Sequence, residues 1–300
     1  MLVLAVLALA AWSGPGRCGQ IEFLHYWTGS LAGGVAEMTD SFNAKASGIT
    51  VSAHGMEHES FKTGIRSRLA WGRAPDIFSY WAGERLRAVA EAGYLAPLDD
   101  LWAGGGLDRL FSRDVAAACR YNGKMYAVPV TQHMVGFFYN TAVFARFGLK
   151  PPRTWEELLD ACARLKRGGV TPFALGAREL WPAQFWFDHL LARTAGPLYH
   201  QGLMAGRHAY DDPQVRRAFS LWADLLRRGY FAPSFASWDW ADAAQAVREG
   251  RAAMTLTGTW FMGFFAADES WRPGRDYGFF RFPTLDPGVP DAASGPIDVL

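Results

Sequence analysis

The sequence predicts an α/β protein of two lobes. From residue 21 onward, short apolar runs with strand-like patterns alternate with amphipathic runs of helical period, which is typical of parallel sheets covered by helices. The chain has 300 residues, half of them hydrophobic, and this is sufficient for two hydrophobic cores. Pro129 lies inside the apolar run 125–130 and cannot donate a ladder hydrogen bond. This strand should therefore lie at a sheet edge or leave its sheet, as a crossover between lobes would.

Three strands and three helices are expected in the first lobe. Because ligands bind beyond the carboxyl ends of parallel strands, Trp27 and Trp81 lie at the expected binding edge. Asp76 follows a proline at the start of the third strand and is either a ligand-binding group or a structural cap. The expected strands are 21–27, 49–53 and 76–81, and the expected helices are 33–46, 61–71 and 83–93.

The middle of the chain carries the clearest local signals. Asn122-Gly123 between apolar runs predicts a type I′ hairpin, since both residues tolerate positive φ. A strand over 125–130 should follow, and then a second, almost wholly apolar strand over 134–139 that is buried on both faces. Thr154 to Glu157 reads as a capping box, which predicts a helix over 155–167.

The second lobe continues the alternation of strands and helices. Asp212-Pro213 indicates a helix start with proline at the first helical position, and the apolar spacing that follows places Trp222 in the core. Trp260 comes just after a strand and a glycine, which suits a cleft better than a core. The expected strands are 171–175, 252–257 and 277–282, a further helix follows 181–186, and 283–290 is expected to lead back to the first lobe.

Composition excludes some functions and favours others. Lysine and arginine number 30 against 29 aspartates and glutamates, with no long basic block, so the electrostatic pattern of a nucleic-acid binder is missing. The chain contains 13 Trp, 21 Phe and 10 Tyr. Most of these rings are expected in cores, but rings on a pocket wall suit ligands that present both C–H faces and hydroxyls, as sugars do.

The N-terminal segment 1–19 resembles a secretory signal. Its first eleven residues form an apolar run too short to span a bilayer, and 8–10 match a small-x-small cleavage site, although basic residues are lacking at the start. We therefore expect a periplasmic or extracytoplasmic location. A lipid anchor on Cys18 is the less favoured alternative, because residues 15–17 do not resemble the usual motif before a lipidated cysteine.

No cofactor, metal site or disulfide framework is expected. The formal G-x-G-x-x-G match at 14–19 lacks the preceding strand that a dinucleotide-binding fingerprint needs. His54 and His58 have helical spacing but no third ligand at a set distance, so a polar loop is favoured over a metal site. Cys119 and Cys162 fall on apolar helix faces and are expected to be buried thiols.

An ordered set of short motifs resembles the carbohydrate-binding (family 1) extracellular solute-binding proteins of ABC importers. Each motif is weak alone, but the set covers about residues 20–285 in the family's order. The central signature is Gly123-Lys-Met-Tyr-Ala-Val-Pro129, Phe137-Phe-Tyr-Asn-Thr141 and Pro151-Pro-Arg-Thr-Trp-Glu-Glu-Leu158, and the others are Ala74-Pro-Asp-Ile-Phe78, Ala92 to Asp99, Gly169 to Ala174, Gly250 to Met254 and Gly258-Thr-Trp260.

This resemblance implies a type II, two-lobed periplasmic binding protein-like fold with a hinge. The first lobe would comprise 20–129 and 283–300, and the second 130–282. It implies reversible capture of a sugar or oligosaccharide between the lobes and delivery to the permease subunits of an ABC importer, by a monomer that breaks no bond. Because family members run on further, we also expect this chain to be truncated at its C-terminus.

The candidate ligand-binding residues are four stacking indoles and three polar side chains. A polar group that matches a hydroxyl rejects ligands lacking it, and the resemblance assigns sugar stacking to Trp260 in particular. Each residue also has a competing core or loop interpretation. The stacking residues are Trp27, Trp81, Trp181 and Trp260, and the hydrogen-bonding residues are Asp76, Gln132 and His133.

Two other functions remain open from the residues. Aromatic platforms and carboxylates also describe a secreted carbohydrate-active enzyme, but the sequence singles out no separated acid and base, so no catalytic residue is assigned. A binder of a non-sugar solute, such as a polyamine or an anion, is the other alternative.

Overall fold

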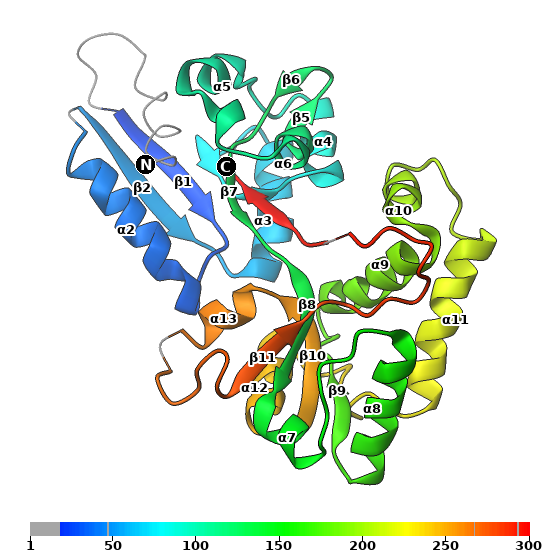
Figure 1. The fold of residues 1–300 in the computed structure, drawn as a ribbon. Helices are drawn as coiled ribbons and strands as arrows, with labels where there is room; N and C mark the ends of the chain where they lie inside the picture. The colour runs from blue at the N-terminus through cyan, green and yellow to red at the C-terminus, as the bar shows by residue number, and fades with distance from the viewer. Residues whose placement is uncertain (1–18, 47, 267, 293) are drawn as a thin grey trace. The chain divides into compact units, whose positions relative to one another are not determined.

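The structure is a computed structural model and describes residues 19–46, 48–266, 268–292 and 294–300. It divides into two compact units (Figure 1): unit 1 is Met1–Gln132 with Pro296–Leu300, and unit 2 is His133–Gly295. The predicted signal-like segment lies outside the described residues except for Gly19, which begins the first strand, and Cys18 also lies outside them. Among the described residues, no helix is both long and apolar enough to cross a membrane.

Unit 1 contains the predicted parallel sheet. Strand β1 (Gly19–His25) lies between β2 (Ile49–Gly55) and β3 (Ile77–Phe78), and both pairs are parallel. Phe23 in β1 is fully buried in the core of this unit. The helices of this part are η1 (Gly29–Leu31), α2 (Ala32–Asn43), which packs along β2, and α3 (His58–Ala70).

The prediction of one strand over 76–81 was wrong, because two strands of different sheets occupy it. Ser79 separates them: it is fully buried, its N–H donates to the Leu24 carbonyl, and its hydroxyl accepts the N–H of Tyr26. After this link, β4 (Tyr80–Trp81) pairs with β12 (Ile297–Val299), which pairs with β7 (Pro129–Gln132). Strand β7 is an edge strand that begins with its proline, in agreement with the edge predicted for Pro129.

The predicted hairpin is present. Asn122 and Gly123 have φ of 50° and 81° and join β5 (Arg120–Tyr121) to β6 (Lys124–Met125). A continuous strand over 125–130 is wrong, because Val128 instead exchanges two backbone hydrogen bonds with Leu300 before β7 begins. The helices around the hairpin are α4 (Glu84–Glu91), α5 (Asp99–Gly105), η2 (Leu107–Arg109) and α6 (Arg113–Ala118).

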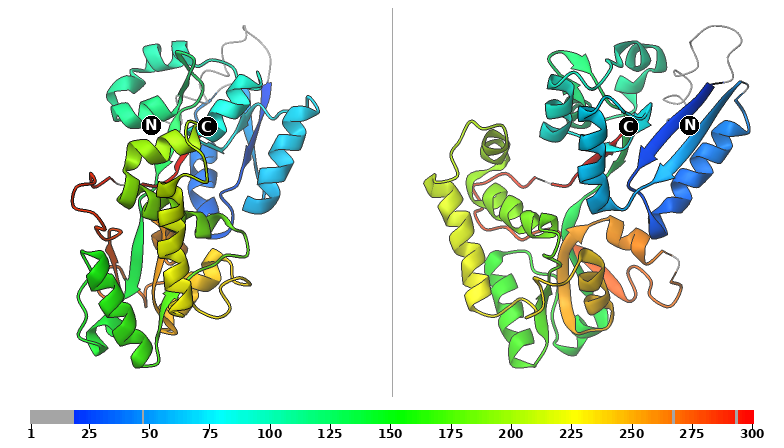
Figure 2. Two further views of the ribbon diagram at one scale, coloured as in Figure 1. Left: turned by 90° about the vertical axis from the view of Figure 1, so that its right-hand side faces the viewer. Right: turned by 180° about the vertical axis from the view of Figure 1, so that it is seen from behind.

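Unit 2 is built on a mixed sheet of order β11, β8, β10, β9 (Figure 2). Strand β8 (Val135–Asn140) runs antiparallel to both neighbours and is buried at every position but one, as its apolar sequence predicted. Phe137 and Phe138 belong to separate hydrophobic clusters, so the sheet is covered on both faces. The other strands are β9 (Thr171–Ala174), β10 (Ala252–Gly258) and β11 (Tyr277–Phe280).

Local signals placed the start of α8 correctly, but the prediction that a helix follows 181–186 was wrong, because α9 already begins at Trp181 and accommodates its proline in the first turn. The capping box of α8 is present, since the Thr154 hydroxyl accepts the N–H of Glu157 at 3.3 Å and the Glu157 carboxylate accepts the N–H of Thr154 at 3.4 Å. Trp222, predicted to be core, is only half-buried, because the fully buried stripe of its helix is limited to Val215, Ala218 and Leu225. The helices are α7 (Thr141–Arg146), α8 (Trp155–Arg167), α9 (Trp181–Ala195), α10 (Pro197–Met204), α11 (Pro213–Arg227), α12 (Trp240–Arg248) and α13 (Trp260–Phe264).

Residues 283–295 pack with unit 2, which differs from the expected lobe boundary. The Thr284 carbonyl accepts the N–H of Trp155 at 2.9 Å, and the Ser294 carbonyl accepts the N–H of Val135 at 2.9 Å. Asp291 forms ion pairs with the buried Arg193 and with Arg281. Residues 130–132, by contrast, belong to unit 1 through the pairing of β7 with β12.

Candidate functional site

An aromatic group follows the first strand of unit 1. The rings of Tyr26 and Trp81 are stacked, with centroids 4.7 Å apart and an interplanar angle of 12°. His58 and Phe61 of α3 meet both rings edge-on. The guanidinium of Arg85, an exposed side chain of α4, lies 4.8 Å from the centroid of the Trp81 ring. Tyr26 and Arg85 thus cover much of the indole surface that was predicted to stack on a ligand.

Tyr26 is anchored at its hydroxyl. The Tyr26 hydroxyl donates to Asp298 Oδ1 at 2.7 Å, and the Thr131 hydroxyl donates to Asp298 Oδ2 at 2.7 Å. Tyr26 is buried, and this burial, together with the neighbouring Asp298 carboxylate, raises the pKa of Tyr26 well above its ordinary value. The phenol therefore stays protonated and remains a hydrogen-bond donor at neutral pH.

Trp27 is buried in the core of unit 1, with 8% of its surface exposed. Its ring contacts Tyr26 at a centroid distance of 5.2 Å and His25 at 6.2 Å. Burial lowers the pKa of His25, whose Nδ1 is buried without a hydrogen-bond partner. Little of the Trp27 ring is therefore open to a ligand in this structure.

Asp76 has a structural partner. Its Oδ2 accepts the backbone N–H of Glu22 at 2.8 Å, which links the residue before β3 to the middle of β1. Asp76 thus precedes its strand, whereas Trp27 and Trp81 come at or after the ends of theirs. The contact matches the structural alternative that the sequence left open for this aspartate.

A second aromatic group lies in unit 2 at the starts of α9 and α13. The rings of Trp181 and Trp260 have centroids 5.6 Å apart at 64°, and Phe185 lies 5.8 Å from Trp260. His133 meets Trp260 edge-on at 5.1 Å, and its Nδ1 is 2.9 Å from the Thr259 hydroxyl. The structure therefore brings together three of the predicted residues, all of unit 2.

The polar ends of the two indoles differ. Trp181 Nε1 donates to Glu179 Oε2 at 3.2 Å. Trp260 Nε1 is buried and has no hydrogen-bond partner, which is costly for an indole N–H. Directly before Trp181, Leu180 has a φ of 65° and is 76% exposed, a strained conformation of a kind that is concentrated at functional sites.

The predicted ligand residues are thus divided between the units. Gln132 is exposed at the end of β7, where it pairs with Ile297 of unit 1. Trp27, Asp76, Trp81 and Gln132 belong to unit 1, and His133, Trp181 and Trp260 belong to unit 2. Sequence reasoning did not assign a ligand or contact role to several neighbouring residues, although Thr259 lies within the Gly258-Thr-Trp260 motif; these residues are Tyr26, Arg85, Thr259, Glu179 and Phe185.

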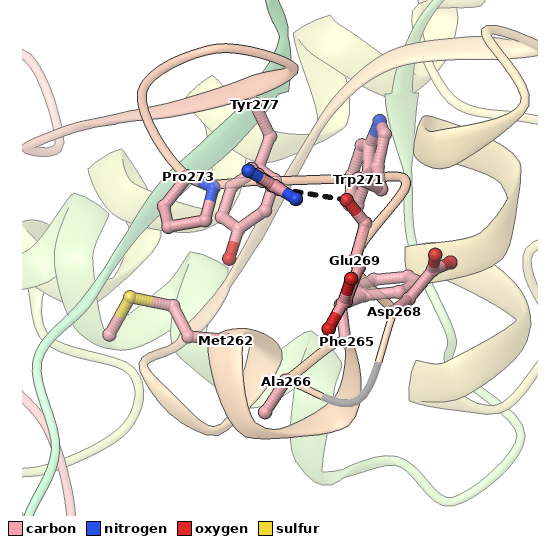
Figure 3. Close-up of a pocket in the computed structure, with 9 residues that line it drawn as sticks. Met262, Phe265, Ala266, Asp268, Glu269, Trp271, Pro273 and Tyr277 are labelled. Carbon is pink, nitrogen blue, oxygen red and sulfur yellow. Dashed lines mark hydrogen bonds between the residues drawn. The ribbon is translucent and has the colours of Figure 1, made fainter.

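Unit 2 also contains a cavity of about 450 Å³ beside α13 (Figure 3). Figure 3 shows the Tyr277 hydroxyl and the Glu269 carboxylate turned toward it. The cavity is lined by none of the predicted ligand residues, and its aromatic walls belong to the small hydrophobic cluster beneath α12. The described residues contain no group of three or more His, Cys, Asp or Glu side chains that could hold a metal ion.

These features define a class of protein: a two-lobed α/β solute-binding protein of type II. The family model described as bacterial extracellular solute-binding protein matches residues 28–298. The chain belongs to this family, as its motifs predicted.

Individual relatives agree with this assignment. An uncharacterized ABC transporter extracellular-binding protein of Pyrococcus horikoshii is 31% identical over 88% of this chain, and a probable sugar-binding periplasmic protein of Rhizobium meliloti is 28% identical over 94%. The chain spans 60% of the length of the first relative and 68% of the second. A solved chitin oligosaccharide binding protein has a TM-score of 0.81 and 27% identity, and the match covers 89% of this chain and 67% of that one.

Proposed function

We propose that this protein captures a sugar or oligosaccharide outside the cytoplasm and delivers it to the permease subunits of an ABC importer. The observation that carries the proposal is the group of Trp181, Trp260 and His133, in which two half-buried indoles and an imidazole lie in contact. Indole faces pack against the C–H surface of a pyranose.

Several features of this proposal rest on the family. Its members include proteins named for sugar binding, and solute-binding proteins of ABC importers act outside the membrane with permease partners. We infer that this chain is exported, acts as a monomer and breaks no bond. Ligand residues of unit 1, which would be Trp81, Trp27, Asp76 and Gln132, belong to the same proposal.

Isothermal titration calorimetry with a panel of solutes tests the function. The panel contains galactose, xylotriose, chitotriose, putrescine and inorganic phosphate. We expect saturable binding of at least one sugar and none of putrescine or phosphate. Binding of putrescine or phosphate alone would support the non-sugar alternative and overturn our proposal.

The enzymatic alternative needs a separate measurement. Labelled xylotriose and chitotriose are incubated with the protein, and the products are separated by chromatography. The proposed binder leaves both oligosaccharides intact. The appearance of shorter products at a rate proportional to protein concentration would instead assign the chain to the carbohydrate-active enzymes.

A further inference from the structure

We propose that Asp298 is a positioning residue for the ligand site of unit 1: through Tyr26 it fixes the orientation of the Trp81 indole. This inference rests on the proposed sugar-binding function for its effect on affinity, but its structural part can be tested without a ligand. All residues involved belong to unit 1.

Asp298 reaches Trp81 by two routes. In the antiparallel pair of β12 with β4, Asp298 lies directly opposite Trp81. Its carboxylate also accepts the Tyr26 hydroxyl at 2.7 Å, and the Tyr26 ring is stacked on Trp81 at 4.7 Å. The backbone of the tryptophan and one face of its indole are therefore held by the same residue.

The Asp298 carboxylate is buried in unit 1, where hydrogen bonds must compensate for its lost hydration. Asp298 is 4% exposed, and a buried charge is costly unless hydrogen bonds compensate for it. Two hydroxyls from different segments donate to it, Tyr26 after β1 and Thr131 in β7. An apolar residue in β12 could fill the same space without this cost. The aspartate instead gives the aromatic ring a defined anchor point.

Ring orientation matters for the proposed ligand. A stacking surface works only if its rotamer is held within about 10–20° of the productive geometry by neighbouring groups. Tyr26 itself is 7% exposed and cannot leave Trp81 without opening the core. Loss of its hydroxyl anchor should thus loosen the indole even when the stack of two rings remains.

Four variants separate positioning from general stability. Tyr26→Phe removes the bond to Oδ1 together with a longer contact of the hydroxyl to the Tyr80 carbonyl at 3.4 Å, Thr131→Val removes the bond to Oδ2, Asp298→Ala removes both carboxylate bonds, and Asp298→Asn keeps an acceptor as the conservative rescue. Each is measured by thermal unfolding, by near-ultraviolet circular dichroism of the aromatic rings, and by calorimetry with chitotriose.

We expect Tyr26→Phe and Asp298→Ala to weaken chitotriose binding about tenfold, and Thr131→Val to change it less than about twofold, although both single bonds stabilise the fold to a similar extent. Asp298→Ala should alter the aromatic dichroism, and Asp298→Asn should restore it. Equal affinities in Tyr26→Phe and Thr131→Val would overturn the proposal while leaving sugar binding intact. If the wild type binds no sugar at all, the function fails, and the dichroism of Asp298→Ala alone decides whether the positioning holds: an unchanged spectrum refutes it.

Discussion

The indole of Trp260 meets the indole of Trp181 at 64°, with the two ring centroids 5.6 Å apart. This contact joins the first residue of α13 to the first residue of α9, which are far apart in the sequence. Replacement of Trp260 by alanine should weaken sugar binding about tenfold, because it removes a large apolar ring face from the proposed site and a loss of about 1.4 kcal/mol of contact is tenfold in affinity. Calorimetry with the panel sugars measures the loss.

Trp222 provides the matched control for this substitution. It is also a half-buried tryptophan of unit 2 with a buried, unpartnered Nε1, but it lies on α11 and contacts neither indole of the pair. Trp222→Ala should leave the sugar affinity unchanged. If both variants lose the same affinity, the effect is one of stability and the Trp260 group is not the ligand site.

Arg85 should restrict access to Trp81. Its guanidinium lies over the indole, and an exposed contact between a cation and a ring contributes about 0.5–1 kcal/mol, which a stacking sugar would have to replace. Arg85→Ala should therefore strengthen sugar binding about two- to fivefold. Arg87→Ala on the same helix is the control, since Arg87 is paired with Glu84 and Glu91. Weaker binding in Arg85→Ala would instead mean that the guanidinium contacts the ligand.

Sequence analysis predicted features that depend on neighbouring residues and missed features that depend on residues far apart in the sequence. The hairpin at Asn122-Gly123 and the capping box of Thr154 each depend on residues within a few positions of one another, so both could be predicted from the sequence. The interruption between β3 and β4 at Ser79 could not be predicted, because it depends on a hydrogen bond from the Tyr26 N–H, 53 residues away. Local pattern alone therefore merged strands that tertiary contacts separate.

The candidate site, like the fold, was predicted from the sequence only in part. Gly258 and Trp260 indicated a ring at a strand end, and the structure places that ring beside Trp181 and His133. The anchor of Tyr26 could not have been found, since Asp298 is 272 residues distant and carries no motif. Burial of Trp27 was likewise hidden, because it depends on the assembly of the unit 1 core from segments that are distant in the sequence.

His189 should make the protein less stable in mild acid. It is 3% exposed, and burial lowers its pKa from 6.5 to about 4 in the folded protein. Between these two pH values the unfolded chain binds more protons at His189 than the folded protein does. The free energy of unfolding is therefore highest above pH 6.5 with respect to this residue and falls as the pH decreases toward 4. From pH 7.5 to 5, His189 should account for a loss of about 2 kcal/mol.

The variant His189→Gln tests this pH dependence. Glutamine cannot take up a proton, and its amide can replace the donor that the imidazole directs at the Phe185 carbonyl. Urea unfolding at pH 7.5 and pH 5 should show a smaller difference between the two conditions in the variant. An identical pH dependence in both proteins would rule out His189 as its source.

Asp291 should hold residues 283–295 on unit 2. Its partner Arg193 is buried, so Asp291→Asn would leave that guanidinium without its counter-ion. We expect a destabilisation of about 2 kcal/mol, below the value for a fully buried pair because Asp291 itself is half exposed. Asp286→Asn in the same segment keeps its acceptor for the Gly288 N–H and should be nearly neutral. Equal unfolding free energies for the two variants would contradict the ion-pair account.

The measurement that tests the central claim most directly is the titration of galactose, xylotriose and chitotriose into the wild type and into Trp260→Ala, followed by tryptophan fluorescence. The account predicts a saturable change for at least one sugar in the wild type and a loss of about tenfold in affinity in the variant. A wild type that responds to none of the three sugars, or a variant that binds as tightly as the wild type, would contradict it.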